Sequence, residues 1–249
     1  MSNCIYDSFV NCKKYNKPWV HYETTDILDS DLLDFIYNFK FPTNEEIITA
    51  PVNFCTLRKF EKISALLKGE QYKQTFLDER HSCEINFTQT FRQQHVQAQR
   101  LFEMFLDKKV ISYLENTGNV SLKDSFLRIQ LLKDIDGYTV TPHIDYEKIF
   151  TLQCFFMTNT ESDIGTILLS ERNGDIIKRT QYHENAGTFF FPTKCTQKNI
   201  PMNNTDEMTW HSFYGKINVQ RISLMVNFFS SIPLGNNAIT NKDVVFYKL

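Results

Sequence analysis

The chain has 249 residues, with 42% hydrophobic and 22% charged side chains, a net charge of −2 and a pI of about 6.3. This composition is that of a globular protein, and it excludes a disordered chain, a collagen and a coiled coil. The charge balance gives no surplus of basic residues to attract nucleic acid, so we expect no nucleic-acid partner. Only 8 glycines occur, and no glycine-rich phosphate-binding loop is among them.

The sequence predicts a cytoplasmic protein that does not enter a membrane. No apolar run approaches the roughly 18 residues of a membrane-spanning helix, and the first residues lack the apolar core of a signal peptide. The 6 cysteines are scattered, without a CxxC pair, so we expect reduced thiols rather than a zinc ribbon. Nothing in the sequence sets the oligomeric state.

The first half of the chain has the periodicity of helices. Residues 26–39 place apolar side chains at near-helical spacing, with Asp29 or Ser30 as the capping residue. A second helix is predicted over 56–68. Residues 88–116 carry the strongest i, i+3, i+4 apolar pattern and predict one long helix.

From about residue 125 the pattern changes to short strands separated by turn residues. The predicted strands are 126–132, 150–157, 166–170, 175–179, 187–191 and 218–229. Many short strands at such spacing are typical of a sandwich or jelly roll. We therefore expect an α+β, mainly β protein with a single domain over 1–249. Its helical or mixed part (about 1–120) would buttress a jelly-roll core (about 125–230).

The tripeptide His143-Ile-Asp145 is the first candidate for chemistry. In a strand, residues two apart project to the same face, so the imidazole and the carboxylate can reach one ion. Two ligands leave a coordination sphere incomplete, and a third must come from elsewhere. The candidates are His211 and, as a rival, His183.

A second candidate lies on the predicted strand near the C-terminus. Alternation places Arg221, Ser223, Met225 and Asn227 on one face of this strand, and the other face is apolar. A buried guanidinium is costly unless an anion pairs with it, and its forked shape suits a carboxylate. Ser223 can add a hydrogen bond to the same anion.

These residues in this order resemble the Fe(II)- and 2-oxoglutarate-dependent oxygenases, in particular the prolyl 4-hydroxylase branch. The family pattern is HxD, a long interval, a distal His, and Arg or Lys about ten residues later. Here it is formed by His143, Asp145, His211 and Arg221, with 68 residues from the first histidine to the second. Glycines and a short apolar run at the family's spacing add to the match: Gly137, Gly165, Gly187 and 150–152.

The resemblance implies a double-stranded β-helix (jelly-roll or cupin-like) core and a hydroxylase. By the family's chemistry, His143, Asp145 and His211 would be the metal ligands and the catalytic centre. Fe(II) would be the cofactor, with 2-oxoglutarate and O₂ as co-substrates. Arg221 and Ser223 would hold the distal carboxylate of 2-oxoglutarate, which would be converted to succinate and CO₂.

One position departs from the family pattern. Many relatives carry a tyrosine that contacts 2-oxoglutarate three residues before the glycine at 137, and this chain has Asp134 there. An acid at this place would repel the co-substrate. Gln130, Tyr138 and Thr151 are the polar residues nearby that could replace the contact.

The substrate, a small molecule or a peptide, is not identified by the sequence. Arg128, Gln130, Tyr146 and Glu147 are candidates to line its pocket, or are simply structural or solvated. Two other functions use the same fold or ligands: a catalytically silent jelly-roll protein that binds a metal or ligand, and a zinc hydrolase. The hydrolase would leave Arg221 unexplained.

Overall fold

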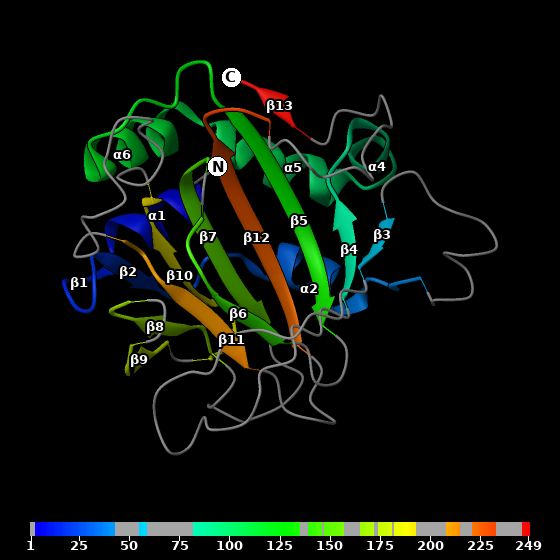
Figure 1. Ribbon diagram of the computed structural model, residues 1–249. Helices are drawn as coiled ribbons and strands as arrows, with labels where there is room; N and C mark the ends of the chain where they lie inside the picture. Colours follow the sequence, from blue (N-terminus) through cyan, green and yellow to red (C-terminus); the bar gives the residue numbers. More distant parts are fainter. Residues whose placement is uncertain are drawn as a thin grey trace.

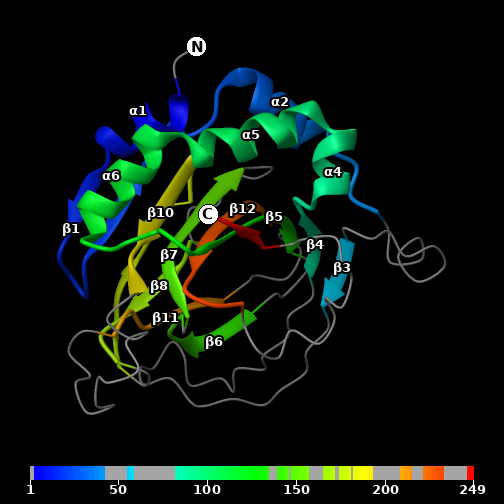
Figure 2. The same cartoon turned by 90° about the horizontal axis from the view of Figure 1, so that it is seen from above.

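The computed structural model of the protein consists of three layers (Figures 1 and 2). Helices cover one face of a large sheet, and a smaller sheet lies against its other face. The structure describes residues 3–42, 55–58, 82–134, 139–145, 147–156, 165–171, 174–180, 182–192, 208–214, 221–232 and 246–249. The statements that follow concern these residues.

The large sheet has nine strands in the order β1-β2-β10-β7-β12-β5-β4-β3, and β13 pairs with β5 outside this path. Its strands are β1 (Lys13–Tyr15), β2 (His21–Thr24), β3 (Cys55–Arg58), β4 (Ser82–Asn86), β5 (Phe126–Asp134), β7 (Lys148–Phe156), β10 (Ala186–Phe190), β12 (Arg221–Phe229) and β13 (Tyr247–Lys248). The small sheet has the order β6-β11-β8-β9. Its strands are β6 (Thr139–His143), β8 (Ile167–Leu169), β9 (Ile176–Arg179) and β11 (His211–Tyr214). The neighbouring strands run antiparallel.

The helices of the described residues form the layer behind the large sheet, as Figure 2 shows. They are α1 (Cys4–Val10), α2 (Ser30–Asn38), α4 (Gln89–Gln94), α5 (Val96–Leu106) and α6 (Lys108–Gly118). Each helix buries an apolar stripe, such as Leu101 and Phe105 of α5, against the sheet. The main hydrophobic core therefore lies between the helices and the outer face of the large sheet.

The two central strands β5 and β12 separate this core from a polar interior. On β12, the outward residues Leu224, Val226 and Phe228 belong to the main core. The alternate residues Arg221, Ser223 and Asn227 are also buried, but they face the small sheet. The large sheet thus buries an apolar face and a polar face at once.

The fold class is as expected, mainly β with buttressing helices, but two predicted helices are corrected. Within the span 56–68, the structure has strand β3 up to Arg58, and the remainder lies outside the described residues. The single helix predicted over 88–116 is three helices. His95 (ψ 102°) and Asp107 (ψ 132°) leave the helical conformation, and the Asp107 carboxylate accepts from the Lys109 N–H (2.7 Å) to start α6.

The N-terminal part, predicted to be helical or mixed, contributes four strands to the large sheet. Strands β1 to β4 are only 3 to 5 residues long and lie at or near its two ends. Short strands of this kind have too few residues for a clear alternation. As a result, the support region and the jelly-roll core share one hydrogen-bonded sheet.

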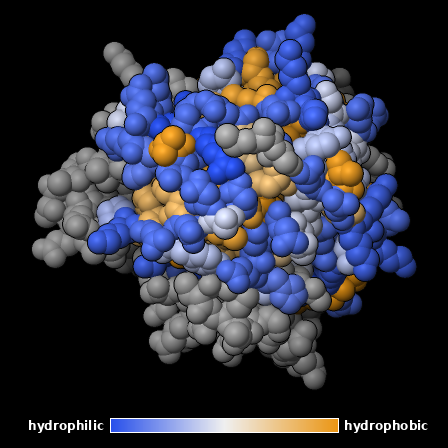
Figure 3. Space-filling model, turned by 180° about the vertical axis from the view of Figure 1, so that it is seen from behind, coloured by the Kyte–Doolittle hydropathy of each residue, from blue (hydrophilic) through white to orange (hydrophobic). Residues whose placement is uncertain are grey.

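The face formed by the helices is largely hydrophilic (Figure 3). Apolar colour on it occurs in small areas separated by polar residues. No helix in the described part of the chain is long and apolar enough to cross a membrane.

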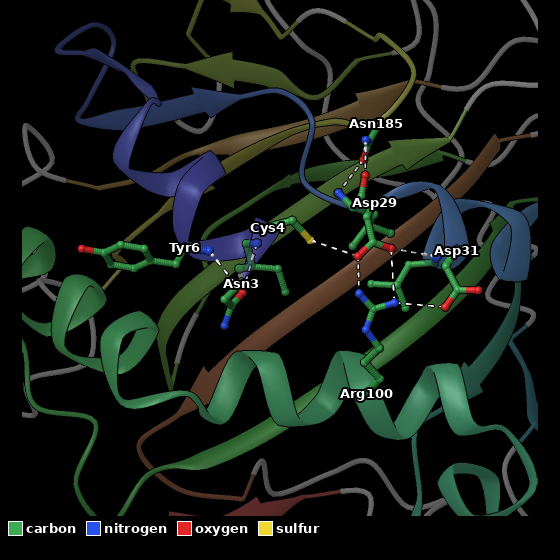
Figure 4. Close-up of polar contacts among 10 residues, drawn as sticks. Asn3, Cys4, Tyr6, Asp29, Asp31, Arg100 and Asn185 are labelled. Carbon is green, nitrogen blue, oxygen red and sulfur yellow. Dashed lines mark hydrogen bonds and ion pairs between the residues drawn. The ribbon is translucent and has the colours of Figure 1, made fainter. Parts of the chain in front are cut away.

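Polar contacts join the helices to each other and to the sheet beneath (Figure 4). Arg100 of α5 forms ion pairs with Asp29 and Asp31, and Asp29 also caps α2 by accepting from the Leu32 N–H. Nearby, the buried Asn185 side chain bonds both backbone groups of Leu28, accepting at 2.9 Å and donating at 2.7 Å. Asn185 precedes β10, so it ties the start of α2 to the large sheet.

We expect Asn185→Ala to lower the free energy of unfolding by about 2–4 kcal/mol. It removes two buried hydrogen bonds and places alanine at φ 54°, where an L side chain is strained. Asn185→Gly should be about 1 kcal/mol milder because glycine tolerates this conformation. Urea denaturation would measure both variants, with Arg100→Ala as the control. The Arg100 ion pairs are about one-third exposed or more, so that loss should be below about 1 kcal/mol. Equal losses for the alanine variants would contradict this account.

Candidate metal centre

The structure brings His143, Asp145 and His211 together. His143 is the last residue of β6 and His211 the first of β11, and the two are directly opposite in the antiparallel ladder. Asp145 follows two residues after His143. One potential ligand atom from each of the three lies within 4.8 Å of the others. The rival His183 does not belong to this cluster.

The separations fit groups that share an ion. The Nε2 atoms of His143 and His211 lie 4.0 and 3.8 Å from the two carboxylate oxygens of Asp145, and the imidazole centroids are 4.2 Å apart. These distances are too long for hydrogen bonds. Ligands about 2.1 Å from a common metal lie roughly 3–4 Å from one another.

His211 is held in the tautomer that a metal requires. Its Nδ1 lies 2.8 Å from the Thr209 carbonyl oxygen, to which it donates, so Nε2 keeps its lone pair for the site. Burial lowers the pKa of His211 and outweighs the opposing effect of Asp145. The imidazole is therefore neutral at physiological pH. The His143 side chain is about one-third exposed (36%), which gives the centre its open side.

Asp145 is kept as an anion by its neighbours. Burial alone would raise the pKa of this carboxyl, but Lys148, His211 and His143 together hold it well below its usual range. The Lys148 ammonium lies 2.7 Å from Asp145 Oδ1. A carboxylate already ionised in a buried place is a ligand that needs no deprotonation to bind a cation.

A second contact orients Asp145 from the large sheet. The Thr151 hydroxyl lies 3.0 Å from Asp145 Oδ2 and 3.1 Å from the Asn227 amide. A hydroxyl has one hydrogen, so it can donate to one of them only. The atom that faces Thr151 is Asn227 Oδ1. With this amide turned over, its nitrogen, which has no partner within the described residues, donates to Thr151, and Thr151 then donates to Asp145. The arrangement is a short relay from β12 through β7 to the metal centre.

The three residues open into a cavity of about 290 Å³ between the two sheets. Polar side chains from the inner face of the large sheet form much of its wall: Glu84, Arg128, Gln130, Thr151, Gln153 and Thr188. Met225 and Phe229 add apolar surface. The cavity thus has polar and apolar side chains of the large sheet on one side and the candidate ligands on the other.

Arg221 also lines this cavity, and it already has an anionic partner. Its Nε donates to Asp134 Oδ2 at 2.6 Å, and both side chains are almost fully buried. The guanidinium carbon lies 3.4 Å from the centroid of the Phe213 ring on β11. Ser223, on the same face of β12, is buried, and its Oγ has no hydrogen-bond partner within the described part of the chain.

Three of the other candidates from the sequence are found as follows. Gln130 lies in the cavity wall, where its amide donates to Glu84 (3.1 Å) and Asn86 (2.9 Å). Arg128 stacks its guanidinium over Phe229, 4.9 Å from the ring centroid. The Glu147 carbonyl accepts from the backbone of residue 230. Tyr138 and Tyr146 lie outside the described residues.

Sequence reasoning missed Glu84, Asn86 and Lys148. The run Ser82–Asn86 alternates polar and apolar residues, which is the signal of a half-buried strand. Lys148 follows Asp145 by three residues. A spacing of three residues does not predict this ion pair unless the turn that brings Lys148 next to Asp145 is known.

Comparison with known proteins gives the fold. No family model and no curated protein matches the chain. A prolyl-4-hydroxylase from Pseudomonas putida aligns with 93% of this chain and all of its own, at 10% identity and a TM-score of 0.51. Two less similar structures are the non-haem α-ketoglutarate-dependent epimerase SnoN of nogalamycin biosynthesis (8% identity, 95% of this chain and 87% of that one, TM-score 0.48) and the viral collagen prolyl hydroxylase of Paramecium bursaria Chlorella virus-1 (12%, 85% and 96%, 0.46).

The chain therefore has the double-stranded β-helix fold of a known 2-oxoglutarate–Fe(II) oxygenase, as the sequence predicted. A His-Asp-His cluster lies inside this fold. At 10% identity the likeness establishes the fold alone.

The cluster predicts which variants lose metal. We expect Asp145→Ala and His211→Ala each to lower the affinity for Fe(II) or Co(II) by at least about 100-fold, because each removes a ligand from a set of three. His183→Ala serves as the control and should bind as the wild type does. Anaerobic titration followed by calorimetry or Co(II) absorption would measure this. Loss of metal in His183→Ala, with His211→Ala unaffected, would make the ligand assignment wrong.

The relay through Thr151 predicts a smaller, separate effect. Thr151→Val keeps the shape of the side chain but removes the hydrogen bond to Asp145, so metal affinity should fall about 10–100-fold. Thr151→Ser, which keeps the hydroxyl, should stay within a few-fold of the wild type. The same titrations would compare the two variants. If valine and serine behave alike, the hydroxyl does not orient the carboxylate.

Proposed function

We propose that the protein is a non-haem Fe(II)- and 2-oxoglutarate-dependent dioxygenase that hydroxylates a substrate still to be identified. The observation that carries this proposal is the position of His143, Asp145 and His211 on one side of the cavity between the two sheets. Two imidazoles and one carboxylate on one face of an ion form the facial triad of non-haem iron oxygenases, which keeps the opposite face open for other ligands.

The donor set fits Fe(II). His211 is neutral with its Nε2 directed to the site, and Asp145 is ionised and fixed by Lys148 and Thr151. When bound, iron with 2-oxoglutarate and O₂ supplies the oxidising power for hydroxylation, and 2-oxoglutarate leaves as succinate and CO₂. The chain contributes the ligands, their orientation, and a cavity that excludes bulk water.

Arg221 and Ser223 are the proposed contacts to the distal carboxylate of 2-oxoglutarate. They share the inner face of β12, and the buried Ser223 Oγ, which has no partner within the described residues, can donate a hydrogen bond to a ligand. Arg221 reaches the same cavity as the metal ligands. Its ion pair with Asp134 argues against binding of 2-oxoglutarate, because the guanidinium already has an anionic partner.

That ion pair supports a second candidate function, a catalytically silent protein of the same fold that binds a metal or another ligand. If Asp134 permanently neutralises Arg221, the cavity lacks the cation that a dicarboxylate needs. The two functions differ in one measurable property, which is turnover of 2-oxoglutarate.

We also propose that residues 1–249 act as one catalytic domain. Strands β1 and β2 from the N-terminal part pair with β10, and β4 pairs with β5. A cut between the support region and the core would divide the large sheet and expose hydrogen-bonding edges on both sides.

The test is succinate formation by the Fe(II)-loaded protein in air, without and with candidate substrates. We expect slow uncoupled release by the wild type and none by Asp145→Ala. Metal binding with no succinate under any condition would favour the silent protein.

Arg221→Leu tests the co-substrate contact. Losing one partner of a buried charge pair typically costs about 2–5 kcal/mol, so 2-oxoglutarate affinity should fall about 30- to several-thousand-fold while metal affinity is retained. Arg221→Lys should lose less because the charge remains. Anaerobic titration of 2-oxoglutarate, followed by the metal-to-ligand absorption, compares the variants. Unchanged affinity in Arg221→Leu would mean that the arginine is structural.

A further inference from the structure

Asp134 and Arg221 face each other at one end of two neighbouring strands of the large sheet, β5 and β12. They are directly opposite in the β5–β12 ladder, Asp134 as the last residue of β5 and Arg221 as the first of β12. Their side chains lie on the inner, cavity-facing side, with only 3% and 4% exposed. The contact is a charge-assisted hydrogen bond of 2.6 Å from Nε to Oδ2.

A buried ion pair of this kind is stable only while both charges stay together. Leaving either charge alone in a place shielded from water costs several kcal/mol, unless it finds a new partner or is neutralised. A ligand carboxylate that comes to Arg221 therefore meets an internal carboxylate of the same charge already bound there. The two anions compete for one guanidinium.

Arg221 has contacts in the cavity beside its bond to Asp134. On the side of the small sheet, the Phe213 ring lies against its guanidinium. Two residues further on the same face, Ser223 has a buried hydroxyl that lacks a partner within the described residues. An arriving carboxylate can bond both Arg221 and Ser223, whereas Asp134 accepts from the guanidinium Nε.

The groups around Asp134 decide what happens when it loses Arg221. Burial raises the pKa of Asp134 above its usual value, and Arg221 opposes this rise without reversing it. The other titratable groups that act on it are Glu84 of β4, a second carboxylate that raises the pKa further, and the Tyr182 hydroxyl. Without Arg221, burial and Glu84 both favour the neutral form. When Asp134 loses its ion pair with Arg221, its carboxylate therefore takes up a proton.

Resting on the proposed function, we propose that Asp134 is an internal competitor for 2-oxoglutarate. The distal carboxylate of the co-substrate takes Arg221 from Asp134, and Asp134 binds one proton as the pair separates. Asp134 thus sets the affinity for the co-substrate and couples its binding to pH. The chain would hold 2-oxoglutarate less tightly than Arg221 and Ser223 alone would allow.

Asp134→Asn tests the competition with little change of shape. It removes the competing charge, so we expect the metal-loaded, anaerobic protein to bind 2-oxoglutarate at least about tenfold more tightly than the wild type, or about 1.4 kcal/mol. Glu84→Gln is the matched control. It removes a buried negative charge from the same cavity without freeing Arg221, and its affinity should change much less.

Calorimetry in buffers of different ionisation heat tests the proton. The wild type should take up about one proton per 2-oxoglutarate near pH 7, and Asp134→Asn close to none. The measurement on the wild type tests whether Asp134 takes up a proton even if the variant does not fold. Zero uptake by the wild type would overturn the proposal.

The outcomes separate this inference from the function on which it rests. Binding to the wild type, with equal or weaker binding to Asp134→Asn, would overturn the competition and leave the proposed function in place; Asp134 would then position Arg221. Binding to Asp134→Asn but not to the wild type would support both. No binding of 2-oxoglutarate to either metal-loaded protein would overturn the proposed function, and the inference with it.

Discussion

The architecture depends on one constraint, the two-sided burial of the central strands β5, β7 and β12. Their outward residues are mostly apolar and pack on the helices, and many of their inward residues are polar and buried, such as Gln130, Thr151 and Asn227. Buried polar groups are costly unless they are hydrogen-bonded. Several inner-face groups are paired accordingly, Gln130 with Glu84 and Asn86, and Thr151 with Asn227, whereas the Ser223 hydroxyl has no partner within the described residues. Packing alone would favour apolar residues on this face, whereas a cavity that binds a polar ligand requires polar ones.

The charges around the cavity are balanced before any ligand enters. Within the described part of the chain, they comprise three carboxylates and three cations: Glu84, Asp134, Asp145, Arg128, Lys148 and Arg221. Histidines that ligate a metal are neutral, so a divalent ion bound here would leave an excess of two positive charges. A dicarboxylate would offset this excess with two negative charges, and the proton proposed for Asp134 would leave the cavity with one positive charge. This balance is consistent with a cavity that gains its metal first and a dianion second.

The sequence was sufficient for the parts of the protein that have long, regular patterns. Nine-residue alternation predicted most of β5 and the whole of β12, and the HxD motif with a distal histidine predicted residues that the fold brings together. The breaks at His95 and Asp107 were missed because local capping overrode a continuous apolar pattern. The sequence marked Asp134 as a departure and predicted repulsion of the co-substrate. Its ion pair with Arg221 depends on cross-strand register, which no spacing along the chain reveals.

The candidate ligands are held by two different sheets, and this has a consequence for the stability of the protein in the cell. His143 and His211 belong to the small sheet, whereas Asp145 is bonded to Thr151 of the large one. An ion bound to all three would act as a brace between the sheets. Its binding free energy adds to the cost of unfolding, by about 2.7 kcal/mol when free metal exceeds the dissociation constant a hundredfold. Iron supply would then govern how much of the protein survives proteolysis, and so its abundance, independently of any effect on turnover.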